Sequence, residues 1–177
     1  MIVDSLKLAR ERQRVAGVVT VAELPRLTQS LHGGGGNLDY AISGDADARE
    51  RPLLRVRVSG VVQLQCQRCL EGMAHEVQVD NAVRLVAAEA LDAEYEAIGA
   101  DPDEPDCIVA SKTLDVAALV EDEVLLALPP YPRHEVSVCK GKVDPSAITG
   151  ANVMNVQAAG AVNALNAFTA LQALKPK

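Results

Sequence analysis

The sequence predicts a single α+β domain, an antiparallel β-sheet meander covered by helices, with helical segments at its N- and C-terminal ends. Two observations predict it: apolar residues alternate with polar ones within residues 37–86, and residues 114–128 carry apolar residues at helical spacing. The chain has 177 residues, which is enough to bury one core of ordinary size. We expect five parts: an N-terminal helical segment (1–36), the sheet (37–86), an acidic loop region (87–112), a long helix with its proline-rich end (113–135) and a C-terminal tail (136–177).

The first 36 residues predict two short helices and one short strand. Residues 4–15 group apolar side chains among basic ones and stop before Gly17, as a short amphipathic helix does. Residues 18–21 then predict a strand and residues 22–31 a second helix. The four glycines at 33–36 predict a flexible loop.

Three stretches with a period of two predict the strands of the sheet. The first contains Leu38, Tyr40 and Ile42, which stand at every second position, as the inward-facing residues of a half-buried strand do. The same alternation runs through residues 54–64 and again through residues 77–85. Because short connections join the three stretches, we expect neighbouring strands to run antiparallel.

The clearest helix of the chain is Leu114–Leu128. Either Thr113 or Asp115 caps its start, and prolines follow its end. Its apolar residues form one stripe, so we expect it to cover the apolar face of the sheet. The acidic tract Asp101–Asp106, which contains two prolines, predicts an exposed loop, and the apolar stripe within residues 164–174 predicts a helical tail.

Composition and charge disfavour two kinds of nucleic-acid binder. Aromatic residues make up 2% of the chain and Trp is absent, so a base-stacking surface is not expected. The net charge of -7 disfavours a non-specific polyanion binder. The charge is uneven, however, because residues 71–135 carry sixteen acidic and three basic side chains, whereas the segments on either side are basic. The acidic middle favours a protein partner at least as much as RNA.

The sequence also predicts where the protein works. No apolar run approaches the ~20 residues that a membrane span requires. The first residues lack the basic and apolar regions of a signal peptide, so we expect a cytoplasmic protein without a membrane partner. In that reducing compartment, the four cysteines (Cys66, Cys69, Cys107 and Cys139) indicate a metal site or free thiols rather than disulfides.

The pair Cys66 and Cys69 is the most specific chemical motif. A strand enters it and another leaves it, so we expect a hairpin tip that presents two thiolates to a structural zinc ion. Tetrahedral zinc needs two further ligands. The first choices are His134 and Cys139, with His75 and Cys107 in reserve. Two other interpretations stay open, namely metal-free structural thiols and redox chemistry, although thiol oxidoreductases place such a pair at a helix N-terminus.

Two charged clusters are candidate contact surfaces. Arg55 and Arg57 share one face of a strand and, with Arg68, could contact RNA phosphates; a solubilising sheet face is the alternative. The run Glu121-Asp122-Glu123 lies away from the apolar stripe of the long helix and predicts a solvated or protein-binding face. Three adjacent acids point in different directions on a helix, so at most two could share a metal ion.

No catalytic signature is recognisable in the chain. It lacks a Ser/His/Asp arrangement, a Walker motif and a His-Glu-x-x-His helix. We therefore expect neither enzymatic activity nor a small-molecule substrate. The alternatives are a metal-dependent hydrolase or nuclease that uses His134 with the acids of residues 121–123, and a thiol-redox protein that uses Cys66 and Cys69.

Two segments in a fixed order carry a family resemblance. They are Leu64–Glu71, which contains the cysteine pair, and Asp115–Pro129, which is followed by Pro132, His134 and Cys139. Together they closely resemble the YceD family, the large ribosomal RNA subunit accumulation proteins of bacteria and plastids. The resemblance spans nearly the whole chain, since the opening helix and the segment from Asn166 to Lys175 also fit.

The resemblance implies a role in the synthesis, processing or stability of the large-subunit (23S) ribosomal RNA during ribosome biogenesis. It brings no established enzymatic activity. The implied partner is the large-subunit RNA or its precursor, contacted either directly or through a ribosome-assembly protein.

Overall fold

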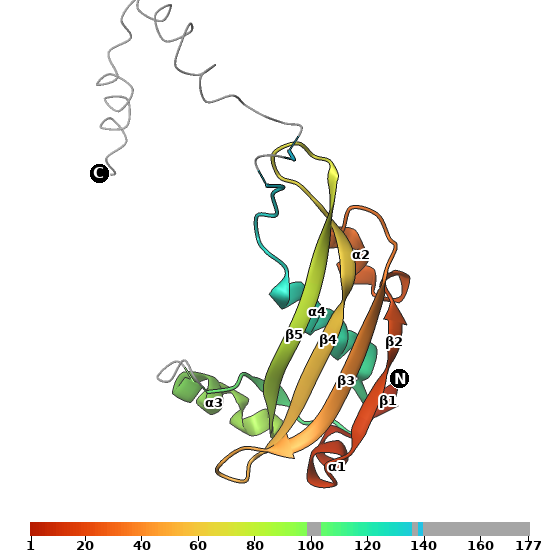
Figure 1. The fold of residues 1–177 in the computed structure, drawn as a ribbon. Helices are drawn as coiled ribbons and strands as arrows, with labels where there is room; N and C mark the ends of the chain where they lie inside the picture. The colour runs from red at the N-terminus through yellow and green to blue at the C-terminus, as the bar shows by residue number, and fades with distance from the viewer. Residues whose placement is uncertain (99–103, 136–137, 140–177) are drawn as a thin grey trace, which may run out of the picture. The chain divides into compact units, whose positions relative to one another are not determined.

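The computed structural model describes residues 1–98, 104–135 and 138–139 (Figure 1). Residues 1–135 form one compact unit. Of a second unit, residues 136–177, only Val138 and Cys139 are described, so the predicted helical tail lies outside the described residues. The predicted mixture of α-helices and β-strands is confirmed.

The main sheet has five strands in the order β2-β3-β4-β5-β6. Their bounds are β2 (Arg14–Thr20), β3 (Asn37–Ala46), β4 (Pro52–Gln65), β5 (Gly72–Val86) and β6 (Cys107–Val109). Strands β2 to β5 pair antiparallel with their successive neighbours, whereas β6 runs parallel to β5. A two-stranded antiparallel sheet joins β1 (Ile2–Val3) to β7 (Leu114–Asp115).

Burial alternates along the strands because the helices pack against one face of the main sheet. In β4, Val56, Val58 and Val62 are buried, while Arg57 and Ser59 between them are exposed. Figure 1 shows the helix α4 lying across the sheet. The apolar face is therefore the inner face, and the face that carries Arg57 is the outer one.

The first helix is shorter than predicted. Helix α1 (Ser5–Arg10) ends five residues early, because Arg12 takes a positive φ of 48° and Arg14 already belongs to β2. The amide of Gly44 in β3 donates to the Gln13 carbonyl at 2.9 Å, which draws the chain into the sheet. Pairing with β3 outweighs the helical spacing of residues 11–15.

The second predicted helix is divided into two pieces. A single 3-10 turn, η1 (Val21–Glu23), precedes the helix α2 (Pro25–Ser30). Leu24 separates them because a residue before proline is disfavoured in the helical conformation.

Helix α4 (Val116–Ala127) corresponds to the predicted long helix, and Asp115 caps it by accepting a hydrogen bond from the Ala117 amide at 3.0 Å. Residues 114 and 115 form β7 instead of helix. The expectation of a solvated acidic face is wrong for Glu121 and Glu123, which are 3% and 5% exposed. Hydrogen-bonding groups of α2 and β5 face these two carboxylates, so burial does not leave them unpaired.

The region 87–112 holds more structure than the predicted loop. A turn, η2 (Ala88–Ala90), and the helix α3 (Leu91–Ile98) form the crossover that leads to the parallel strand β6. Arg84 of β5 is 1% exposed and forms an ion pair with Glu94 of α3 at 2.7 Å. Part of the acidic surplus of this region therefore neutralises a buried arginine. Within the described residues, no helix is long and apolar enough to cross a membrane.

Candidate metal centre

The cysteine pair lies in the tight connection between β4 and β5. The Cys66 amide donates to the Glu71 carbonyl and the Leu70 amide donates to the Cys66 carbonyl, both at 2.9 Å. Leu70 closes the turn with a positive φ of 61°. The pair thus occupies a β-hairpin tip and not the N-terminus of a helix.

The proline-rich segment after α4 returns to this hairpin tip. The Gln67 amide donates to the Pro132 carbonyl at 2.8 Å, and the Arg68 guanidinium donates to the His134 carbonyl at 3.2 Å. The His134 amide in turn donates to the Cys66 sulfur at 3.4 Å. We call this assembly, residues 66–71 together with residues 132–134, the clasp.

The clasp gathers sulfur and nitrogen donors at one point. Cys69 Sγ lies 3.3 Å from His134 Nδ1. The ligand atoms of Cys66, Cys69, His134 and Cys139 all lie within 4.8 Å of one another. The structure therefore brings together the four side chains that the sequence analysis selected as zinc ligands.

The surroundings of His134 suit a metal ligand. Its second ring nitrogen, Nε2, lies 3.3 Å from the Gly72 carbonyl, which can accept a hydrogen bond from it. Metal-bound histidines commonly donate their other ring N–H to such a carbonyl, which fixes the tautomer. Three thiolates and one imidazole are a donor set that structural zinc takes in tetrahedral sites. The residues present therefore fit zinc.

Backbone amides favour the thiolate form of Cys66. Burial alone would raise the pKa of this thiol, but the amides of His134, Cys69 and Arg68 and the Cys69 side chain lower its pKa to about 5. Metal ligation requires the deprotonated thiol, so these amides prepare the sulfur for it. Cys107 differs: it lies in β6 away from the cluster, and burial raises the pKa of its thiol.

The comparisons with known proteins identify the family of the chain. The sequence model of the family described as large ribosomal RNA subunit accumulation protein YceD matches residues 54–175. The chain belongs to the YceD family. A protein of Haemophilus influenzae with that same name is 27% identical over 144 residues, which cover 79% of this chain and 78% of the relative. No solved structure matches the chain.

The YceD match includes the whole clasp and α4, and it begins at Leu54 within β4. Helix α1 and the strands β2 and β3 precede it. The matched range thus contains the hairpin tip, the helix that leads to His134, and Cys139.

The three arginines predicted as RNA contacts are not equivalent. Arg55 and Arg57 lie on the outer face and share one carboxylate, Asp80, at 3.7 and 3.1 Å. Arg68 lies in the clasp, at the far end of β4, and its guanidinium donates to a carbonyl there. The structure therefore separates Arg68 from the other two.

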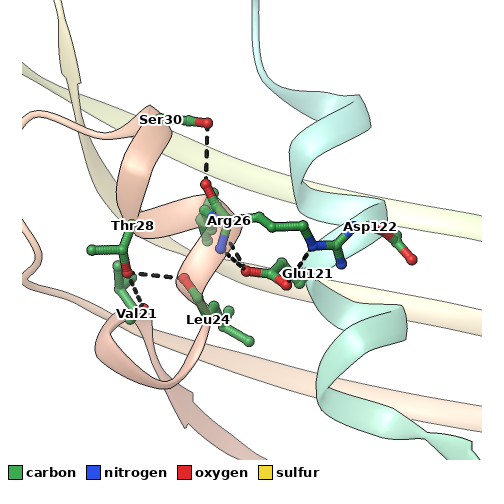
Figure 2. Close-up of polar contacts among 8 residues, drawn as sticks. Val21, Leu24, Arg26, Thr28, Ser30, Glu121 and Asp122 are labelled. Atoms are coloured by element: carbon green, nitrogen blue, oxygen red, sulfur yellow. Dashed lines mark hydrogen bonds and ion pairs between the residues drawn. The ribbon is translucent and has the colours of Figure 1, made fainter.

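Glu121 holds α2 against α4, a role that sequence reasoning missed (Figure 2). Its Oε1 accepts hydrogen bonds from the amides of Arg26 at 2.7 Å and Leu27 at 3.0 Å, and its Oε2 accepts one from the Arg26 guanidinium at 2.9 Å. The N-cap position of α2 is occupied by Leu24, whose side chain cannot cap. Glu121 supplies the missing cap from 95 residues away. The sequence held one signal of this role. Leu24 precedes Pro25 at the N-cap position, and a leucine side chain cannot cap a helix, so a cap from elsewhere was needed.

Proposed function

We propose that this protein is a non-catalytic factor that promotes the accumulation of large-subunit (23S) ribosomal RNA, by acting in its synthesis, processing or stability. Membership of the YceD family carries this proposal, because the family and the Haemophilus influenzae relative are both named for that role. The protein would act in the cytoplasm on the RNA or its precursor. It would do so directly or through a ribosome-assembly protein, without a small-molecule substrate.

The proposed role of the clasp is structural. Cys66, Cys69, His134 and Cys139 would hold one zinc ion, with thiolate–zinc distances of about 2.3 Å and a zinc–nitrogen distance of about 2.0–2.1 Å. Four protein ligands leave no open coordination position, so the site would not activate water. The ion would tie the proline-rich segment to the hairpin tip.

Direct RNA contact is proposed for Arg55 and Arg57, with Arg68 as a further contact from the clasp. The side chains of Arg55 and Arg57 are 41% and 62% exposed, so phosphates could reach them. Their ion pairs with Asp80 are surface pairs, which contribute little to stability. A phosphate could therefore replace Asp80 with little loss of free energy. Asp122 is the one acid of residues 121–123 that is exposed enough to contact a protein partner.

The test is deletion of the gene, followed by comparison of precursor and mature 23S RNA and of the ratio of ribosomal subunits. We expect less mature 23S RNA and fewer large subunits, with recovery when the wild-type gene is returned. Normal amounts of both in the deletion strain would contradict the proposal.

A nuclease is the rival function, and a separate assay decides between the two. Purified protein is incubated with precursor RNA and Mg²⁺, beside the variants Glu121→Gln and Asp122→Asn. We expect no cleavage, because Glu121 is engaged by α2 and not directed at a reacting group. Clean cleavage that either variant abolishes would favour the nuclease.

A further inference from the structure

Three arginines surround one carboxylate at the end of the sheet beside α3. Arg49 and Arg51 lie in the connection between β3 and β4, and Arg84 lies in β5. The Arg51 guanidinium donates to Oε1 of Glu104, and the same oxygen lies 3.7 Å from Arg84 Nη2 and 4.0 Å from Arg49 Nη1. We call these three arginines the arginine cluster. Glu104 thus occupies the point at which an anion would bind to it.

One edge of the Arg84 guanidinium is left unfilled. The side chain is buried, and its Nη1 pairs with Glu94 at 2.7 Å. Its Nε and Nη2 have no hydrogen-bond partner among the residues that the structure describes. These two nitrogens form the fork that binds two oxygens of an oxyanion side by side. Because unsatisfied donors of a buried cation cost free energy, the cluster suits a ligand with more acceptor oxygens than Glu104 directs at it.

The charges around the arginine cluster match one anion in the place of Glu104. Asp47 pairs with Arg51 at 2.5 Å, as Glu94 does with Arg84. With Glu104 included, three carboxylates balance three arginines; without it, one positive charge remains. A phosphodiester carries one negative charge, and its oxygens fit the guanidinium fork. It therefore matches Glu104 in charge and supplies acceptors for the donors that Glu104 leaves unfilled.

The Glu104 carboxylate lies near the surface, and the arginine cluster alone holds it. Its side chain is 15% exposed, and that of the neighbouring Arg49 is 74% exposed. Within the described part of the chain, all polar contacts of the Glu104 side chain are with the arginine cluster. The hydrogen bond from Arg51 lowers the pKa of Glu104, so the carboxylate is ionised at neutral pH. An incoming anion therefore replaces only these contacts.

The arginine cluster adjoins the arginines proposed to contact RNA. The strand register pairs Arg84 of β5 with Leu53 of β4. Because side chains alternate along a strand, Leu53, Arg55 and Arg57 share the outer face, and Arg84 lies on that face beside Leu53. Two residues of a strand span about 7 Å, so the cluster begins that far beyond Arg55.

We propose that the arginine cluster is a phosphate site, which Glu104 fills in the free protein and a phosphodiester of the bound RNA fills in its place. RNA held at Arg55 and Arg57 presents that phosphodiester at a high effective concentration, which favours the exchange. Glu104 is thus an internal competitor that lowers the affinity for RNA. The inference deepens the proposed function and rests on it for the identity of the ligand.

The test measures binding of a single-stranded fragment of precursor 23S RNA to the full chain over a range of salt concentrations. Glu104→Gln and Glu104→Ala empty the cluster, and measuring both keeps the result independent of how well one side chain is tolerated. The matched control is Glu96→Gln, which removes the same charge from an exposed position of α3. Thermal unfolding with and without inorganic phosphate checks the fold of each variant and tests free phosphate as the ligand.

We expect both Glu104 variants to bind the RNA at least about threefold more tightly than the wild type, and Glu96→Gln to bind like the wild type. The log–log salt dependence should steepen by about 0.7, because one more phosphate is neutralised. Adding Arg51→Gln to Glu104→Gln should remove the gain. In NMR spectra of Glu104→Gln, the Nε–H signal of Arg84 should shift when RNA binds.

The proposal is overturned if the Glu104 and Glu96 variants gain equally, since the effect is then one of overall charge. It is also overturned if no protein binds the RNA, if the Arg84 signal stays in place, or if the Glu104 variants lose stability without gaining affinity, as a purely structural ion pair would. Stabilisation of Glu104→Gln by inorganic phosphate with unchanged RNA affinity would make free phosphate the ligand instead. Normal 23S RNA in the deletion strain contradicts only the proposed function, since RNA binding is measured with purified protein.

Discussion

Glu121 of α4 is a buried carboxylate that caps α2. Burial opposes ionisation of its carboxyl, but hydrogen bonds from the Leu27 amide and from Arg26 outweigh burial and lower its pKa below the ordinary 4.5. Glu121→Gln should lower the free energy of unfolding at pH 7 by about 2 kcal/mol, because a neutral amide binds these donors less well. The contribution of Glu121 is complete above pH 4.5 and is lost as the pH falls through its folded pKa.

Urea unfolding at pH 7 and at several values below 4.5 measures this effect. The difference between wild type and Glu121→Gln should shrink as the pH falls. Asp122→Asn is the control, since the Asp122–Arg26 pair is half exposed on both sides and should contribute less than about 0.5 kcal/mol. Equal losses in the two variants, or a difference independent of pH, would show that Glu121 is not the cap of α2.

Gly44 is a second position where one residue is decisive. A Cβ atom there would lie 1.9 Å from the Leu8 carbonyl oxygen in α1, which belongs to the backbone and cannot rotate away. Gly44→Ala should therefore push α1 from the sheet and destabilise the fold by about 1–3 kcal/mol. Gly35→Ala is the matched control, because a Cβ there meets no atom within 4 Å and thermal unfolding should hardly change. A Gly44→Ala variant as stable as wild type would mean that α1 yields without cost.

At the level of elements, the contacts of the clasp let us predict which amides metal removal affects. Treatment with a chelator, or Cys66→Ser, should speed amide exchange at Gln67 and His134, whose partners are Pro132 and the Cys66 sulfur. The amides of central β4 should exchange as before, because the core of a chain this long does not depend on the ion. Hydrogen exchange measured with and without chelator checks both expectations.

Metal content supplies the control for the clasp. Protein purified without chelator should carry about one equivalent of zinc. Cys107→Ala should keep it, because Cys107 lies outside the cluster. Less than about a tenth of an equivalent in the wild type would leave these cysteines as structural thiols.

At the scale of the whole molecule, direct RNA binding by a chain of net charge -7 must rest on a local basic surface. Arg55→Glu with Arg57→Glu should abolish direct association with precursor 23S RNA, and the association of the wild type should weaken steeply as the salt concentration rises. The matched control, Arg49→Glu with Lys112→Glu, changes the charge equally at exposed positions away from the pair. Filter binding over a range of salt concentrations measures both. Binding that is unchanged by the first pair and insensitive to salt would mean that RNA is reached through a partner.

The sequence by itself determined the mixed class, the strands β3 to β5, the long helix and the four candidate ligands. Period-two and helical spacing report which side of a segment is buried, and that information is local. The cysteine pair between two strands also indicates a hairpin tip. A tetrahedral zinc ion held by this pair needs two further ligands. His134 and Cys139 were the pair that the sequence offered together beyond the long helix.

Only the tertiary structure decided where α1 ends, that β6 runs parallel to β5, and that Glu121, Glu123 and Arg84 are buried. Each depends on a partner distant in sequence: β3 for the residues after α1, α2 for Glu121, and α3 for Arg84. From its sequence neighbours alone, a charged residue is predicted to be exposed to solvent. Its burial becomes favourable only when another segment supplies hydrogen bonds or an opposite charge. Partners of this kind produce no periodic pattern in the sequence. Charged residues that the sequence predicts to be exposed are therefore buried in the structure.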